Sequence, residues 1–490
     1  MRYDLVLRNG RAIDPESGLD ALADVGITGR TVSKVAVGIP DDGSPSVDIR
    51  GMVIAPGFID LHSHASSIAG QRLQACDGVT TALDLEAGES PLTAAYARAI
   101  SEGRPINYGF SASWALSRMA QIGGIRLDGR QVFRQHIGVA AWQRPAGPAE
   151  VSKVLEAICA DLDRGGIGIG VLLGYAPRID PAEYLAVARL AAERGVPVFT
   201  HTRALAELAP DLPIDGAEEL TRAAETTGAH MHYCHINSTS RRFLERVYGE
   251  VNRASTAGAT VTTEAYPYGA GATGIGATFL DPANLDRIGI KTTDITYVPT
   301  GERVRDAARL AELRATDPGG LAIHDFLDED DPADRALMLL PLRTAGTMVA
   351  SDAMPLEWLG PEPDPRAWPL PDHGVTHPRT AGTFARAVRL LTRELGYPVT
   401  EAIRRCSLLP AKVLEASVPA MRAKGRLRQG SDADLVVFDP DVISERSTYR
   451  ASTRQSAGIH HVLVNGSFVV RDGHVIQDAY PGQPLYASTR

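Results

Sequence analysis

Short apolar runs alternate with amphipathic segments along residues 54–414, and this alternation constrains the fold more than any other feature of the sequence. The apolar runs include VTTALDL, VPVFT, MHYCHI and GTMVAS, and segments such as PAEYLAVARLAAERG lie between them with helical spacing. A strand followed by a helix, repeated several times, is typical of parallel βα units. The sequence therefore predicts an α/β fold with a parallel sheet at its centre.

The two ends of the chain are rich in short strands instead. Turn signals such as RNGRAID separate alternating segments near the N-terminus, and DADLVVFDP, IHHVLVNG and SFVVRDG follow near the C-terminus. We therefore expect one small β-domain built from residues 1–53 and 419–490, beside a βα barrel over residues 54–418. Residues 269–348 interrupt the βα pattern with GAGATGIG and the acidic run DFLDEDDPADR. Such a stretch predicts an inserted segment, either a lid or a surface excursion.

Composition and charge exclude several classes of protein. With 490 residues, 44% of them hydrophobic and 22% charged, the chain is not disordered, collagen-like or a coiled coil. The net charge of −9 argues against a nucleic acid or an anionic membrane as partner. No apolar run approaches the ~18 residues of a membrane span. Asp4 and Arg8 break up the apolar core that a signal peptide needs, so we expect a cytoplasmic protein.

Six His, Glu and Asp side chains come at the carboxyl ends of predicted strands. His62 and His64 are two residues apart in GFIDLHSH, so both imidazoles project from the same face of one strand. The other four are Glu86 after VTTALDL, His201 after VPVFT, His235 in MHYCHIN and Asp352 after GTMVAS. Because the carboxyl ends of barrel strands meet on one face, these six predict a site for one or two zinc-like divalent ions.

Each of these residues also has a purely structural interpretation. Glu86 can be an acidic residue at a helix N-terminus, and Asp352 can be a helix cap. A lone histidine in an apolar run is usually a hydrogen-bonded core residue, which is our expectation for His230 and His232. We prefer the metal interpretation because six such residues at strand ends would be a poor coincidence.

Several motifs together point to one family. GxxDxHxH around His62, later histidines on two strands, a Ser-Asp pair on the last strand and the tail KGRLRQGSDADLVVFDP resemble the amidohydrolase superfamily. GVTTALDLEAG, GIGIGVLLGYAP, EAYPYGAG and HPRTAGTF more closely resemble the N-acyl-D-amino-acid deacylase (D-aminoacylase) family, over essentially the whole chain. The resemblance implies a (β/α)8 barrel of the TIM type with a small β-sandwich domain, a zinc site, amide hydrolysis, and an inserted segment covering the site.

The chain departs from that family at two positions. In the best-known D-aminoacylases a cysteine after the second strand anchors the metal, and here Glu86 takes its place with a carboxylate that can bridge two ions. The family's SHxK lysine, which contacts the substrate carboxylate, is replaced by Asn237, which cannot neutralise a charge. Either Arg203 or Arg379 supplies that charge, or the substrate is not a simple N-acyl amino acid. A structural ion pair is the competing interpretation of both arginines.

The residues and the resemblance together predict a zinc-dependent amidohydrolase that deacylates N-acyl-D-amino acids. The six candidate ligands hold one or two zinc ions, and a metal-activated water attacks the amide with Asp352 as general base. Tyr175 and Tyr266 are candidate donors to the oxyanion. His377 either lines the site or orients Arg379.

Other functions stay open at this point. The same chemistry could act on a cyclic amide or another non-carboxylate N-acyl or carbamoyl compound, which would suit Asn237. A metal-binding protein with a defunct site is a further alternative, against which the complete set of six candidate ligands argues. A hydrolase with Cys234 as nucleophile is weaker, because the adjacent His235 is needed as a ligand. We expect a small-molecule amide as substrate and leave the oligomeric state open, a homo-oligomer included.

Overall fold

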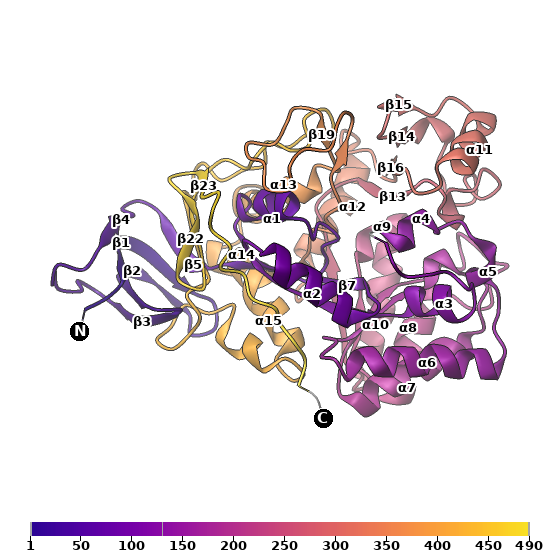
Figure 1. Cartoon of the computed structure of the whole chain (residues 1–490), viewed down its shortest axis with the longest axis horizontal. Coiled ribbons are helices and arrows are strands. Elements are labelled where there is room, and N and C mark those ends of the chain that lie inside the picture. Colours follow the sequence, from indigo (N-terminus) through magenta and orange to yellow (C-terminus); the bar gives the residue numbers. More distant parts are fainter. Residues whose placement is uncertain (1, 130, 489–490) are drawn as a thin grey trace.

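The computed structural model describes residues 2–129 and 131–488. Figure 1 shows a strand-rich end that contains the N-terminus and a larger helix-covered body beside it. No helix in the described residues is long and apolar enough to cross a membrane.

Eight parallel strands form the centre of the larger body. They are β6 (Phe58–Asp60), β7 (Val79–Glu89), β8 (Asn107–Ser113), β9 (Ile169–Leu172), β10 (Val198–His201), β11 (Met231–Tyr233), β12 (Val261–Ala265) and β17 (Met348–Val349). They lie side by side in this order. The first and last strands meet just beyond their ends, where Ser63 pairs with Ala353 and the His64 N–H donates to the Ala353 carbonyl at 2.8 Å. The sheet is a nearly closed barrel, which confirms the predicted α/β barrel class.

Helices follow the barrel strands and cover the outside of the barrel (Figure 1). The main ones are α1 (Ile68–Ala75), α2 (Leu92–Glu102), α3 (Trp114–Gln121), α6 (Pro148–Leu162), α7 (Pro181–Arg194), α8 (Gly216–Thr227), α10 (Leu244–Thr256), α12 (Pro332–Arg343) and α13 (Arg379–Arg389). Shorter helices are α4 (Val132–Gln135), α5 (Ala140–Gln143), α9 (Ile236–Ser240), α14 (Val399–Ile403) and α15 (Leu409–Leu414).

Helix α7 illustrates how the local sequence sets these bounds. The Asp180 side chain accepts a hydrogen bond from the Ala182 N–H, and Pro181 occupies the first helical position. Gly195 ends the helix in the left-handed conformation, at φ 65°, which a glycine adopts without strain. Tyr184 and Val187 lie on its buried face at helical spacing. These residues therefore set where the helix begins and ends, and its apolar spacing sets which face is buried.

The strand-rich end is one nine-stranded sheet. Its strands are β1 (Leu5–Asp14), β2 (Leu19–Thr28), β3 (Thr31–Ala36), β4 (Ser46–Asp48), β5 (Val53–Pro56), β20 (Leu435–Phe438), β21 (Ile459–Val464), β22 (Ser467–Arg471) and β23 (His474–Val475). Strand β5 joins the two halves, because it pairs parallel with β1 and antiparallel with β20. The two chain ends therefore lie in one sheet although more than 370 residues separate β5 from β20.

A smaller antiparallel sheet lies between β12 and α12. Its order is β13-β16-β14-β15, formed by β13 (Ala270–Gly274), β16 (Leu321–Asp325), β14 (Ile295–Tyr297) and β15 (Glu302–Arg303), and it is accompanied by α11 (Ala307–Thr316). A two-stranded hairpin, β18 (Glu357–Trp358) and β19 (Gly374–Val375), follows the last barrel strand. Both additions lie on the side of the barrel where its strands end, so they border the site described next.

Candidate metal centre

The Glu86 carboxylate lies at the centre of four histidines. Its Oε2 is 3.1 Å from His62 Nε2 and 3.5 Å from His64 Nε2. Its Oε1 is 2.6 Å from His235 Nε2 and 3.0 Å from His201 Nδ1. Each oxygen of one carboxylate therefore faces its own pair of histidine nitrogens, an arrangement that offers two adjacent sites joined by Glu86.

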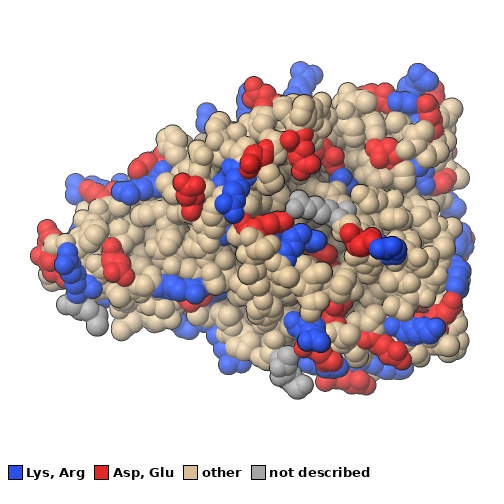
Figure 2. Space-filling view, viewed as in Figure 1, with Lys and Arg blue, Asp and Glu red and all other residues tan. Residues whose placement is uncertain are grey.

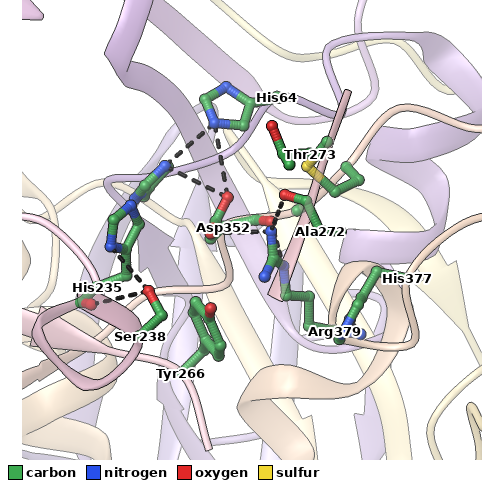
Figure 3. Close-up of polar contacts among 12 residues, drawn as sticks. His64, His235, Ser238, Tyr266, Ala272, Thr273, Asp352, His377 and Arg379 are labelled. Carbon is green, nitrogen blue, oxygen red and sulfur yellow. Dashed lines mark hydrogen bonds and ion pairs between the residues drawn. The ribbon is translucent and has the colours of Figure 1, made fainter. Parts of the chain in front are cut away.

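Asp352 adds a second carboxylate on the His62 and His64 side. Its Oδ1 is 3.5 Å from His62 Nε2 and 3.6 Å from His64 Nε2. Its Oδ2 is 2.8 Å from Arg379 Nη2, so one oxygen is held by a cation while the other faces the histidines (Figure 3). His235 and Asp352 have positive φ values, 32° and 48°, which side-chain-bearing residues adopt rarely and mostly at functional sites.

The protonation of the cluster follows from its crowded charges. Burial alone would lower the pKa of His62, but Glu86, Asp352 and Glu264 raise it well above its usual value. Burial would raise the pKa of Glu86, but His62 and His235 hold it well below its usual range. Glu86 is thus ionised, and a divalent ion could replace the proton on His62.

A carboxylate behind the cluster fixes the orientation of His62. Glu264, at the end of β12, accepts a hydrogen bond from His62 Nδ1 at 2.6 Å, which leaves Nε2 directed at Glu86. The other oxygen of Glu264 is 3.1 Å from His232 Nε2. His232 is therefore a buried core histidine, as expected, and it contacts the partner of a candidate ligand.

Two further histidines are held in the same way. His64 Nδ1 is 3.1 Å from Asp84 Oδ1, and burial, which would lower the pKa of His64, is outweighed by Asp84, so this pKa is raised to about 10. His235 Nδ1 is 3.1 Å from the Ser238 hydroxyl (Figure 3). Partners of this kind fix the ring orientation and the tautomer of metal-binding histidines. The nitrogen and oxygen donor set and its supporting contacts therefore fit a divalent metal such as zinc.

A cavity of about 500 Å³ opens directly above this cluster. Its lining includes His64, Glu86, His201, His235 and Asp352. Its walls combine charged and apolar side chains, and the apolar ones include Leu116, Val132, Phe133, Met354, Leu356 and Trp358. Figure 2 shows the face viewed in Figure 1 hollowed near its middle, with acidic and basic side chains interspersed around the hollow. A cavity of this size fits a small organic substrate.

Of the six predicted substrate contacts, only Tyr175 lines this cavity among the described residues. Its ring packs 4.9 Å from His201, and its hydroxyl is 2.9 Å from Thr273 Oγ1. Tyr266 lies beneath Arg379, whose guanidinium is 4.5 Å from the centre of the tyrosine ring. Asn237 donates to the Tyr266 carbonyl at 3.0 Å. Tyr266 and Asn237 therefore border the cluster from behind the cavity wall.

Both arginines that were predicted to bind the substrate carboxylate are paired with a carboxylate of the protein itself. The Arg203 guanidinium is buried and makes two hydrogen bonds to Glu219, at 2.7 and 3.0 Å, so the structure places Arg203 in a structural ion pair outside the cavity. Arg379 is paired with Asp352. His377 is buried, and its Nδ1 accepts a hydrogen bond from the Arg379 backbone N–H at 3.1 Å. His377 therefore contacts the start of α13 and does not line the cavity.

The comparisons with known proteins agree with this geometry. The sequence profile of the amidohydrolase family matches residues 46–470. The chain belongs to the amidohydrolase family. It is 28% identical to the N-acyl-D-glutamate deacylase of Alcaligenes xylosoxydans xylosoxydans, covering 96% of this chain and 94% of the relative. It is 27% identical to the D-aminoacylase of the same organism, covering 98% and 96%.

Solved structures show the same fold. A D-aminoacylase crystal structure superposes with a TM-score of 0.75 at 23% identity, over 99% of this amidohydrolase and 100% of that chain. N-acyl-D-glutamate deacylase from Bordetella bronchiseptica, solved with zinc and a phosphonate inhibitor, gives a TM-score of 0.74 at 24% identity over the same shares. Another D-aminoacylase neighbour has a binuclear metal centre. This amidohydrolase is thus a homologue of the N-acyl-D-amino-acid deacylases with residues that suit metal-dependent amide hydrolysis.

Sequence reasoning overlooked several residues that support the site. Asp60 accepts hydrogen bonds from the backbone N–H groups of His62, at 3.2 Å, and of Ser351, at 3.0 Å, and so joins the first and last barrel strands. Asp60 and Glu264 stand at the ends of apolar runs, so the rule that identified the six candidate ligands also applies to them. Cys234 is buried, and burial together with Glu264 raises the pKa of its thiol well above the usual value, which opposes a nucleophilic role.

Proposed function

We propose that this amidohydrolase deacylates N-acyl-D-amino acids, with Asp352 as general base. The observation that carries the proposal is the position of Asp352, which lines the cavity with one oxygen facing His62 and His64 while Arg379 holds the other. The named activities of the two full-length relatives supply the substrate class.

The metal would be held by the four histidines, Glu86 and Asp352. Glu86 fits the place between two ions because each of its oxygens faces a different histidine pair. When bound, a divalent ion supplies a Lewis acid for the amide carbonyl and lowers the pKa of a coordinated water. Histidine and carboxylate ligands together suit zinc.

The remaining steps belong to side chains of the protein. Asp352 Oδ1 accepts the proton of the attacking water and returns it to the nitrogen that leaves when the C–N bond breaks. Arg379 fixes the orientation of Asp352 through the 2.8 Å contact between its Nη2 and Asp352 Oδ2. Burial raises the pKa of Tyr175, so its hydroxyl stays protonated and can donate to the developing oxyanion. Apolar side chains in the wall, such as Leu116 and Phe133, offer a surface for the acyl group.

The test is hydrolysis of paired substrates by the zinc-loaded enzyme. We expect amine release from N-acetyl-D-amino acids and little from the L-enantiomers. Asp352→Asn should lower kcat by about 10²- to 10⁴-fold while the protein retains most of its zinc by elemental analysis. Asp330→Asn, an exposed control outside the cavity, should leave the rate unchanged. Failure to hydrolyse either enantiomer with zinc bound would refute the proposal and favour a cyclic or non-carboxylate amide as substrate.

A further inference from the structure

Two neighbouring barrel strands, β8 and β9, supply none of the six candidate metal ligands. The six lie on or just after β6, β7, β10, β11 and β17. Strand β9 lies four strands from β17 in both directions around the barrel, through β12, β11 and β10 on one side and through β6, β7 and β8 on the other. The end of β9 therefore lies across the site from Asp352, which follows β17.

Apolar side chains form the cavity lining beside β8 and β9. Leu172 ends β9, and Leu116 lies in the first turn of α3, which follows β8. Leu127 follows α3, and Val132 and Phe133 begin α4. We call these five residues the apolar sector. Leu127 and Phe133 are only partly buried, so part of the apolar surface of this sector remains open to the cavity.

The apolar sector adjoins the metal centre through Tyr175. The Phe133 ring meets the Tyr175 ring edge to face at 5.2 Å, and the Tyr175 ring is 4.9 Å from the His201 ring. Leu172 is also the register partner of His201 on the adjacent strand. A group bound at the metal centre beside His201 would therefore meet the apolar sector directly behind Tyr175.

The cavity lining offers no free cation beside this sector. Within residues 2–129 and 131–488, the arginines of the lining are paired with carboxylates: Arg98 with Glu89, Arg104 with Glu102 and Arg134 with Glu357. A charged group placed against the sector would lose its water without gaining a partner. An apolar group would instead remove its own surface and that of the sector from water, which is favourable.

The proposed reaction decides which end of the substrate meets the apolar sector. Asp352 returns its proton to the leaving nitrogen, so the amine portion lies on the β17 side, where Met354 and Leu356 also line the cavity. The acyl substituent leaves the carbonyl carbon in a different direction from that nitrogen. It therefore extends across the site, toward the ends of β8 and β9.

We propose that the apolar sector selects substrates with an apolar acyl group larger than acetyl. The proposal rests on the deacylase function proposed above and specifies the acyl half of its substrate. The cavity of about 500 Å³ lies within the range of ~300–1,000 Å³ that encloses drug-sized ligands. An acetyl group has a single methyl beyond its carbonyl carbon and would leave most of the sector in contact with water.

The experiment compares three acyl groups on the same amine. N-acetyl-, N-(4-methylpentanoyl)- and N-succinyl-D-leucine are assayed with the zinc-loaded enzyme. The last two acyl groups have nearly the same shape, but succinyl ends in a carboxylate where 4-methylpentanoyl has two methyl groups. We expect kcat/KM for 4-methylpentanoyl to exceed that for acetyl by about 10- to 100-fold, because each buried methylene favours binding by about fourfold. The succinyl compound should be the poorest substrate.

Variants of Phe133 test whether the sector causes this preference. Phe133→Ala should lower kcat/KM for the 4-methylpentanoyl substrate by about 10-fold, mainly through KM, and that for the acetyl substrate by less than about threefold. Phe133→Lys should reverse the preference between 4-methylpentanoyl and succinyl. Phe279→Ala is the matched control, because the Phe279 ring is 5.4 Å from Tyr175 and 6.0 Å from His201 but does not line the cavity. It should leave the ratio of the two kcat/KM values unchanged.

The outcomes separate this proposal from the deacylase function. Acetyl and 4-methylpentanoyl substrates hydrolysed equally well, or equal losses on both in Phe133→Ala, would overturn the role of the sector and leave the deacylase function intact. If no N-acyl-D-leucine is hydrolysed, the deacylase function fails, and isothermal titration of 4-methylpentanoate and acetate into the zinc-loaded enzyme decides the role of the sector. We expect 4-methylpentanoate to bind about 10-fold more tightly than acetate, and Phe133→Ala to remove the difference. Equal binding of the two acids would overturn the proposal. If Phe133→Ala does not fold, Leu127→Ala decides the same comparison.

Discussion

Glu264→Gln tests whether the carboxylate behind His62 prepares the metal site. Glu264 accepts from His62 Nδ1 at 2.6 Å, and this short contact directs the other ring nitrogen at Glu86. Glutamine has nearly the same shape and keeps one acceptor oxygen, but it removes the negative charge. The change therefore isolates the electrostatic part of the support and leaves the packing of the barrel interior intact.

The expected loss of zinc affinity follows from the role of such contacts in other metal sites. Loss of a carboxylate that supports a metal-binding histidine costs about 10- to 100-fold in metal affinity, or about 1.4–2.7 kcal/mol. Since glutamine still accepts a hydrogen bond from His62, we expect the loss of zinc affinity in Glu264→Gln to lie near the lower end of this range. Glu264→Ala should fall near the upper end, because both His62 and His232 then lose their partner.

Zinc affinity is measured by competition with a chromophoric chelator, starting from metal-free enzyme. Glu219→Gln is the matched control, since Glu219 is a buried carboxylate that pairs with Arg203 away from the site. Glu219→Gln should lower the free energy of unfolding in urea without changing the zinc affinity. Equal zinc affinity in wild type and Glu264→Gln would refute the reasoning, because His62 would then be oriented without help from that charge.

Two further predictions concern stability. Lys424 Nζ is 2.5 Å from Asp434 in a buried pair, so Lys424→Met, which leaves that carboxylate without its cation, should cost about 3–5 kcal/mol in urea denaturation, and a cost below 1 kcal/mol would contradict this. Arg426 lowers the pKa of Glu16 from its usual 4.5 to about 2. Because the folded pKa is the lower one, this contribution is complete above pH 4.5 and is lost as the pH falls toward 2. Glu16→Gln should therefore cost about 1–2 kcal/mol at pH 7, after allowance for solvent screening, and much less at pH 3, which parallel denaturation curves would show.

The repeated strand and helix pattern predicted the barrel because each unit is a local feature of the sequence. VTTALDL and VPVFT form buried strands β7 and β10, and PAEYLAVARLAAERG forms α7. The small sheet β13-β16-β14-β15 could not be predicted in this way. Its strands are two to five residues long, and its pairing joins segments about 50 residues apart, so the order depends on contacts that no local pattern encodes.

The search for ligands at the carboxyl ends of predicted strands identified six side chains that lie together, but it could not show what the arginines contact. Arg203 lies two residues after His201, yet its guanidinium turns to Glu219, which is 16 residues later on the next helix, α8. Whether an arginine is paired or free depends on which carboxylates the fold places beside it, and the sequence does not show that.

Asp352 lies at the boundary between two charge environments. Its Oδ1 faces His62 and His64, while its Oδ2 is 2.8 Å from Arg379 Nη2. A general base needs a fixed orientation and one oxygen free to take a proton. The pairing with Arg379 leaves Oδ1 as the oxygen that takes the proton of the attacking water in the proposed reaction.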